Sequence, residues 1–154
     1  MAKIETDDNG DQIINIGENV GANGVNDPDD VLVIQAMLKY LTQFTKKWTR
    51  VTLGEPTGAI DQNTRQAIFD YQQFVRTRPG SAHLFWVAKD GAVSSFRPGL
   101  QLLRKQALTI TSMNGDCGLL SAALRDGTDH IDAITLRHPF TVGVVLGRFN
   151  PLFL

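Results

Sequence analysis

Apolar side chains recur at helical spacing along the first part of the chain. Four of them would share one face of a helix: Val31, Ile34, Leu38 and Leu41. Directly before them, Asp27 supplies a capping carboxylate and Pro28 suits the first helical position. The pattern predicts a helix over residues 28–44 that is central to the core.

A second helical pattern follows a connecting segment that is rich in basic residues. One face of it carries Thr64, Ile68, Tyr71 and Val75. Asp61 can cap the amide near Thr64, and Pro79-Gly80 ends the pattern. We expect this second helix to pack against the first.

The period changes between residues 84 and 96. Asp90-Gly91 is a two-residue turn signal between runs of aromatic and apolar side chains. This predicts a β-hairpin over 84–96, and Pro98 can open a short helix after it.

The C-terminal part of the chain has shorter patterns. They predict a helix at about 116–125, which Gly127 ends, and extended stretches at 131–136 and 140–146. No internal repeat is visible along the chain.

Acidic residues dominate the N-terminal end. Residues 1–30 hold eight acidic residues and a single basic one, Lys3. We expect residues 1–15 to form a flexible acidic arm in which 12–16 is a short edge strand. Taken together, the patterns predict a small α+β protein.

Composition and charge exclude several classes of protein. A length of 154 residues fits one domain, or one small domain with an extension. The net charge of -1 is too balanced for binding that depends on neutralising phosphates, so nucleic acid is disfavoured as a partner. The single cysteine, Cys117, cannot form an intrachain disulfide or a four-cysteine zinc site. No run approaches the ~18 apolar residues of a membrane span.

Two blocks of sequence resemble peptidoglycan-binding-like domains. Residues 20–31 (VGANGVNDPDDV), followed by Ile34-Gln35 and Leu38, are similar to the glycine-rich loop and first helix of that family. Residues 57–68 (TGAIDQNTRQAI), followed by Tyr71-Gln72, are similar to its second block. Thr57 and Asp61 depart from the family pattern, which has an acidic residue and a second glycine there.

The resemblance implies a fold, a domain division and a function. It covers residues 16–78, or 16–108 if the predicted hairpin is the divergent end of the module, and leaves 109–154 as a C-terminal extension of a helix plus strands. The implied fold is a small helical module. The implied function is non-catalytic attachment to the cell wall, with neither cofactor nor metal ion.

Five residues are candidates for peptidoglycan binding. Gln35 and Gln72 occupy the glutamine positions of the family pattern, but they can equally tie helix ends to loops. Asn63 and Arg65 could meet the carboxylates of the stem peptides, and solvation is the alternative. Trp48 lies among Lys46, Lys47 and Arg50 as in a sugar or anionic-polymer contact, and it can equally close the helix pair.

A hydrolase is an alternative function. Cys117 and His138, in stretches that look faintly like the catalytic pieces of papain-like wall amidases, could form a thiolate and its base at a helix start. Only 21 positions separate them, and residues 109–154 are too few for such a fold. We therefore expect a protein that is not an enzyme.

Self-assembly is a further alternative. The C-terminal tail is apolar, with Phe149, Leu152, Phe153 and Leu154 available to dock on another copy. The acidic N-terminal segment could meet the basic segment 76–105, which would give a homo-oligomeric ring or filament.

Localisation follows from the resemblance and from the first residues. The family usually acts outside the cytoplasm, and residues 1–12 lack the basic and apolar regions of a leader. We expect an extracellular or cell-envelope protein that travels by a leaderless route, such as a phage-like or injection apparatus. A cytoplasmic location stays open.

Overall fold

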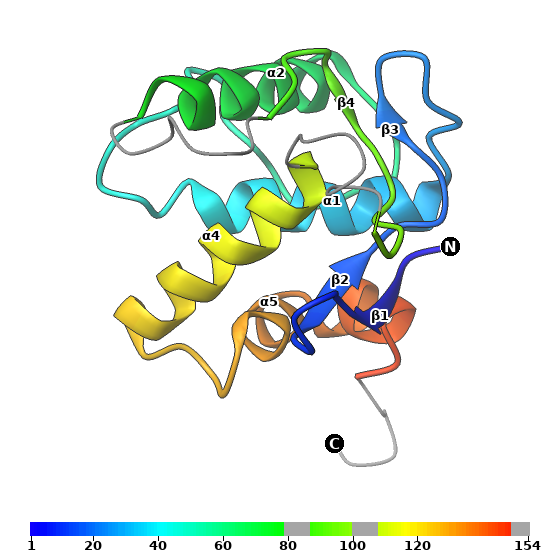
Figure 1. The fold of residues 1–154 in the computed structure, drawn as a ribbon, viewed down its shortest axis with the longest axis vertical. Helices are drawn as coiled ribbons and strands as arrows, with labels where there is room; N and C mark the ends of the chain where they lie inside the picture. Colours follow the sequence, from blue (N-terminus) through cyan, green and yellow to red (C-terminus); the bar gives the residue numbers. More distant parts are fainter. Residues whose placement is uncertain (79–86, 100–107, 149–154) are drawn as a thin grey trace.

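The computed structural model describes residues 1–78, 87–99 and 108–148. These residues form a small α+β fold of helices and two short antiparallel sheets (Figure 1). In chain order the elements are β1 (Lys3–Thr6), β2 (Gln12–Asn15), β3 (Val20–Gly21), α1 (Pro28–Leu41), α2 (Gln62–Thr77), β4 (Ala92–Val93), α4 (Thr109–Leu124), α5 (His130–Arg137) and a π-helical turn, η1 (Pro139–Gly143).

The first predicted helix is confirmed as α1 and is the centre of the core. The Asp27 side chain accepts hydrogen bonds from the amides of Asp29 and Asp30, which fixes the helix start. Nearly every residue of α1 is buried, because α2 lies on one side of it, α5 and η1 on the other, and α4 crosses it (Figure 1). The helix ends at Leu41, three residues before the predicted end.

The second predicted helix is confirmed as α2. Asp61 Oδ1 accepts a hydrogen bond of 2.7 Å from the amide of Thr64. The predicted inward residues Thr64, Ile68, Tyr71 and Val75 are all buried. Tyr71 packs edge-on against Trp48, with ring centroids 5.7 Å apart, so the connecting segment folds back onto α2.

The N-terminal segment is folded, which corrects the prediction of a flexible arm for residues 1–15. β1 and β2 pair antiparallel, with Ile4 opposite Ile14. Ile13, Ile14 and Ile16 belong to the core, and Ile14 is fully buried. The burial of these side chains stabilises the hairpin despite the acidic composition of its surroundings. The edge strand predicted at 12–16 is confirmed as β2.

The predicted hairpin at 84–96 is wrong in its pairing. Gly91 adopts a positive φ of 73° at the predicted turn, but β4 pairs with β3, where Val93 lies opposite Val20. Residues 87–89 form no strand, and 84–86 lie outside the described residues. The side chain of Gln72 binds the backbone of Gly91 and Ala92, and this tertiary contact sets the position of the turn.

The C-terminal part is helical where extended chain was predicted. α4 begins at Thr109 instead of 116, because Ile110, Met113 and Cys117 are drawn into the core. The stretches 131–136 and 140–146 fold mainly as α5, η1 and helical turn. Asp129 caps α5 by accepting from the amide of Asp132 at 2.7 Å. Most of the helix predicted after Pro98 lies outside the described residues.

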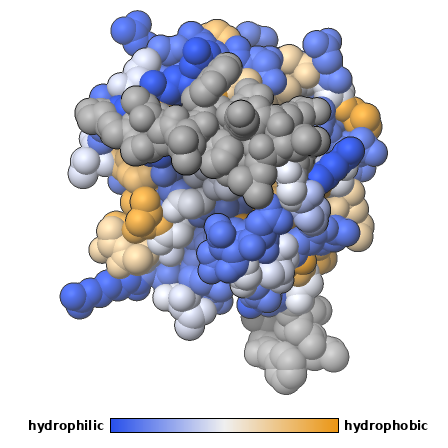
Figure 2. Space-filling model, viewed as in Figure 1, coloured by the Kyte–Doolittle hydropathy of each residue, from blue (hydrophilic) through white to orange (hydrophobic). Residues whose placement is uncertain are grey.

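The surface seen in Figure 2 is largely hydrophilic, and the apolar patches among its coloured residues are small and separate. None of the helices in the described parts of the chain is long and apolar enough to cross a membrane.

Candidate functional site

Gln35 lies on α1 and holds the loop before α2. Its Oε1 accepts hydrogen bonds from the amides of Thr57 and Gly58, both at 2.9 Å. Its Nε2 donates to the carbonyl oxygen of Ala59 at 2.9 Å and to the hydroxyl of Thr64 at 3.0 Å. Gln35 is only 6% exposed. Its carboxamide is thus used for internal hydrogen bonds.

Gln72 repeats this arrangement one helix later. Its Oε1 accepts from the amide of Gly91 at 2.9 Å, and its Nε2 donates to the carbonyl oxygen of Ala92 and to the hydroxyl of Thr109, both at 3.0 Å. In each case a helix glutamine binds the amide of a positive-φ glycine, the carbonyl oxygen of the alanine after it, and the hydroxyl of a threonine in a later helix. The two glutamines therefore tie a helix to a loop in a similar way.

This similarity was missed in the sequence because the segments around the two glutamines differ in length and composition. The signal that could have found it is short: Thr57-Gly58-Ala59-Ile60 matches Asp90-Gly91-Ala92-Val93, and each follows a helix with an inward glutamine. The hydrogen bonds of both glutamines tie helices to loops.

Trp48 closes the helix pair. Its Nε1 donates to the carbonyl oxygen of Leu41 at 2.9 Å, and the residue is only 8% exposed. One side of it still borders a hollow of about 450 Å³, which Lys47, Arg50, Gln66 and Asp70 also line. The basic residues are exposed, so this hollow has a cationic rim.

A smaller hollow of about 150 Å³ lies at the start of α2. Gln35, Asn63 and Asp61 line it together with residues 52–55 and Thr57. Hydrogen bonds from Thr64 hold the pKa of Asp61 below its ordinary value, and Lys39 does the same for Glu55. Both carboxylates are therefore ionised near neutral pH, and that of Glu55 pairs with Lys39 at 2.8 Å.

The two hollows share no lining residue, but residues of segment 47–55 and of α2 line both of them. We call the pair the α2 groove. The structure brings Gln35, Asn63 and Trp48 to this groove. It does not bring Arg65, which is exposed and lines neither hollow, or Gln72, which is fully buried against the loop at 90–92.

Cys117 does not lie at a helix start. It is in the middle of α4 and fully buried, and burial, followed by the charge of Asp116, raises its pKa well above the ordinary thiol value. His138 lies beside Glu55, with 3.1 Å between Nδ1 and Oε2. The helix dipole that the hydrolase alternative requires is absent at this cysteine.

Some predicted residues fall outside this description. Phe149, Leu152, Phe153 and Leu154 lie beyond the described residues. Within residues 1–78, 87–99 and 108–148, no group of three His, Cys, Asp or Glu side chains is placed to hold a metal ion.

Comparisons of the chain with models of known protein families, with curated proteins and with solved structures find no match. The resemblance to peptidoglycan-binding-like domains thus rests on the residue pattern, and it stays a prediction.

Proposed function

We propose that the protein is a non-catalytic module that binds peptidoglycan through the α2 groove. The observation that carries the proposal is that two hollows beside α2 are lined by Trp48 with the exposed Lys47 and Arg50, and by the exposed Asn63. Binding to the wall requires that the protein reaches the cell envelope, and this location is part of the proposal.

The chemistry of the groove suits a glycan that carries peptides. Lys47 and Arg50 offer charged donors for the carboxylates of stem peptides at one end. The exposed Asn63 offers a carboxamide for hydroxyl and acetamido groups at the other. Trp48 serves as a wall of the groove, because most of its ring surface is already buried.

Binding to purified peptidoglycan sacculi in a pulldown tests the proposal. We expect the native protein to sediment with sacculi at micromolar concentration. Lys47→Glu combined with Arg50→Glu removes the cationic rim and should weaken retention about tenfold. The matched control, Lys3→Glu with Arg97→Glu, changes the net charge equally at exposed positions outside the groove.

The polar end is tested separately with Asn63→Ala, for which the exposed Gln73→Ala on the same helix is the control. A roughly threefold to tenfold loss is expected for Asn63→Ala alone. Failure of the native protein to bind, or equal loss in test and control variants, contradicts the proposal.

Self-assembly is the second candidate function, and one surface observation favours it. Leu136, Phe140 and Val144 follow one another at four-residue spacing on α5, η1 and the turn after it, and each is more than half exposed. Apolar residues in such a row are typical of interfaces. Light scattering on the full chain and on a variant that lacks residues 149–154 decides: an assembly that falls to about 17 kDa supports this function, and an unchanged monomer excludes it.

A further inference from the structure

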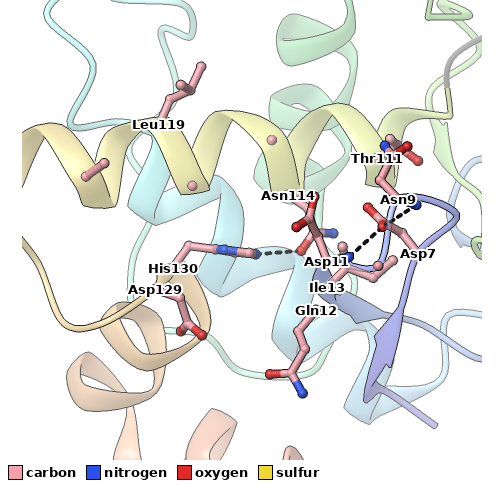
Figure 3. Close-up of a pocket in the computed structure, with 14 residues that line it drawn as sticks. Asp7, Asn9, Asp11, Gln12, Ile13, Thr111, Asn114, Leu119, Asp129 and His130 are labelled. Atoms are coloured by element: carbon pink, nitrogen blue, oxygen red, sulfur yellow. Dashed lines mark hydrogen bonds between the residues drawn. The ribbon is translucent and has the colours of Figure 1, made fainter.

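A larger groove lies between the β1–β2 hairpin, α4 and the start of α5 (Figure 3). We call it the hairpin groove, and its volume is about 690 Å³. Its walls come from residues 7–13, 111–122 and 129–130. It shares no lining residue with the α2 groove.

The floor of the hairpin groove is a bare stretch of helix. Gly115, Gly118 and Ala122 face it from α4, so a ligand can approach the helix backbone. A Cβ atom at Gly115 would meet nothing within 4 Å, and one at Gly118 would lie 3.8 Å from Nδ1 of His130. The imidazole nitrogen therefore borders the space above Gly118.

His130 is fixed in one tautomer by Asn114. Nδ2 of Asn114 donates to the carbonyl oxygens of Ile14 and Ile110, both at 2.9 Å, and its Oδ1 accepts from the amide of Ile14 at 2.8 Å. Oδ1 must therefore also accept from Nε2 of His130, 2.8 Å away (Figure 3). The proton of the neutral ring is on Nε2, and Nδ1 keeps a lone pair.

Nδ1 of His130 has no hydrogen-bond partner among the described residues, although the residue is only 8% exposed. Burial lowers the pKa of His130, partly offset by the charge of Asp129, so the ring is neutral near pH 7. This nitrogen is an acceptor at the wall of the groove, where a donor from a ligand can reach it.

Three carboxylates, those of Asp7, Asp11 and Asp129, line the groove together with this acceptor. Asp7 Oδ1 accepts from the amides of Asn9 and Asp11, and Asp129 Oδ1 caps α5. The Oδ2 atoms of Asp7 and Asp129, and both oxygens of Asp11, have no hydrogen-bond or ion-pair partner in the described parts of the chain. They are therefore available to a donor from outside.

No lysine or arginine is among the described residues that line the groove. Arg148 reaches the rim, where it donates to Oε1 of Gln12 at 3.3 Å, but it contacts none of the three carboxylates. The groove thus combines negative charge with hydrogen-bond acceptors. Ile13 and Leu119, the latter 70% exposed, add apolar surface.

We propose that the hairpin groove binds a primary ammonium on a short aliphatic stem, such as a lysine side chain of a peptide. The ammonium has three N–H donors and no acceptor, so it can donate to the acceptors that line the groove, among them Nδ1 of His130 and the carboxylate oxygens of Asp11 and Asp129. The stem lies over Gly118 against Leu119. This inference does not rest on peptidoglycan binding, because it concerns a separate surface.

The test is a titration of the full chain with a small probe at physiological salt, monitored by ¹⁵N–¹H NMR. The probe is Nα-acetyl-lysine-N-methylamide, and the uncharged probe is the norleucine analogue, which has the same stem length. A ligand of about 14 heavy atoms should bind with a Kd of about 1 mM. We expect the amide signals of Gly115, Gly118 and His130 and the ¹⁵Nδ1 signal of His130 to move with the lysine probe only.

Two pairs of variants complete the test. Asp11→Asn with Asp129→Asn removes two charges while the asparagine at 129 still caps α5, and it should weaken binding about tenfold. Glu18→Gln with Asp29→Asn makes the same change of charge outside the groove and should leave binding unchanged. No shift at 20-fold the expected Kd, equal shifts with norleucine, or equal affinity of both double variants overturns the proposal. The same Asp11/Asp129 variant should still bind to sacculi. Loss of lysine-probe binding with normal binding to sacculi would show that the hairpin groove and the α2 groove act independently.

Discussion

Gln35 and Gln72 make similar hydrogen bonds on two successive helices. Each accepts from the backbone amide of a loop glycine, and each donates to an alanine carbonyl oxygen and to a threonine hydroxyl. The two side chains thereby fix the position of both loops relative to the helices.

Gln72→Ala should destabilise the protein strongly. The substitution leaves the amide of Gly91 and the carbonyl oxygen of Ala92 without their side-chain partner, where the residue is fully buried. We expect a loss of about 3 kcal/mol in the free energy of unfolding. Urea unfolding measures this free energy. The control is Gln73→Ala, because Gln73 is exposed on the same helix, and it should change the free energy of unfolding by less than about 0.5 kcal/mol. Equal effects of the two variants would show that the bonds of Gln72 contribute nothing.

Ile14→Ala distinguishes a folded hairpin from a flexible arm. Ile14 is fully buried in β2, so truncation should cost about 3 kcal/mol of stability through lost burial and an added cavity. Val25→Ala, at a position that is 69% exposed, is the control and should be nearly neutral. If the thermal melt of Ile14→Ala matched that of the native protein, the result would indicate that residues 1–15 form a flexible arm.

Stability should fall as the pH drops below about 6.5, the ordinary pKa of histidine. Burial lowers the pKa of His130 and also that of His138, where Glu55 opposes the shift and Lys39 and Arg137 add to it. Both rings then bind protons more readily in the unfolded chain, so the unfolded state is favoured as the pH falls through 6.5 toward the folded-state pKa values.

Urea unfolding at pH 7.5 and 5.5 measures this dependence. The native protein should be less stable at pH 5.5, and His130→Gln with His138→Gln should lose most of the difference. A native protein that is equally stable at the two pH values would refute the assignment of neutral buried histidines.

Cys117 should be unreactive in the folded protein. Burial keeps the thiol protonated and out of contact with solvent. We expect iodoacetamide at pH 7 to label Cys117 slowly without denaturant and rapidly in urea. We also expect the Cys117→Ala variant to release as much peptide from sacculi as the native protein. Rapid labelling of the native state would revive the Cys–His hydrolase alternative.

The sequence by itself determined the two helices that organise the molecule. Asp27-Pro28 and Asp61 are caps whose effect depends on amides two or three residues away, and the apolar period is a property of a single helix. Signals of this kind act locally, and α1 and α2 therefore appear where the pattern predicts them. The two inward glutamines were also identified in the sequence, although their partners were not.

Only the tertiary structure decided the remaining elements. Ile131, Ile134, Val142 and Val144 have the β-branched character of strands, but the Asp129 cap and packing against α1 and α4 make this region helical. β4 pairs with β3, about seventy residues earlier, because the contact of Gln72 with Gly91 places the turn there.

The hairpin groove shows the same limit at the level of a site. Asp11, Asn114 and His130 lie in three separate segments, and none of these segments has a binding pattern of its own. Their chemistry arises when the folding of β2 against α4 gives Asn114 its partners at Ile14, and Asn114 in turn fixes the tautomer of His130. Local propensity cannot encode such a relationship, because it exists only after distant segments have packed together.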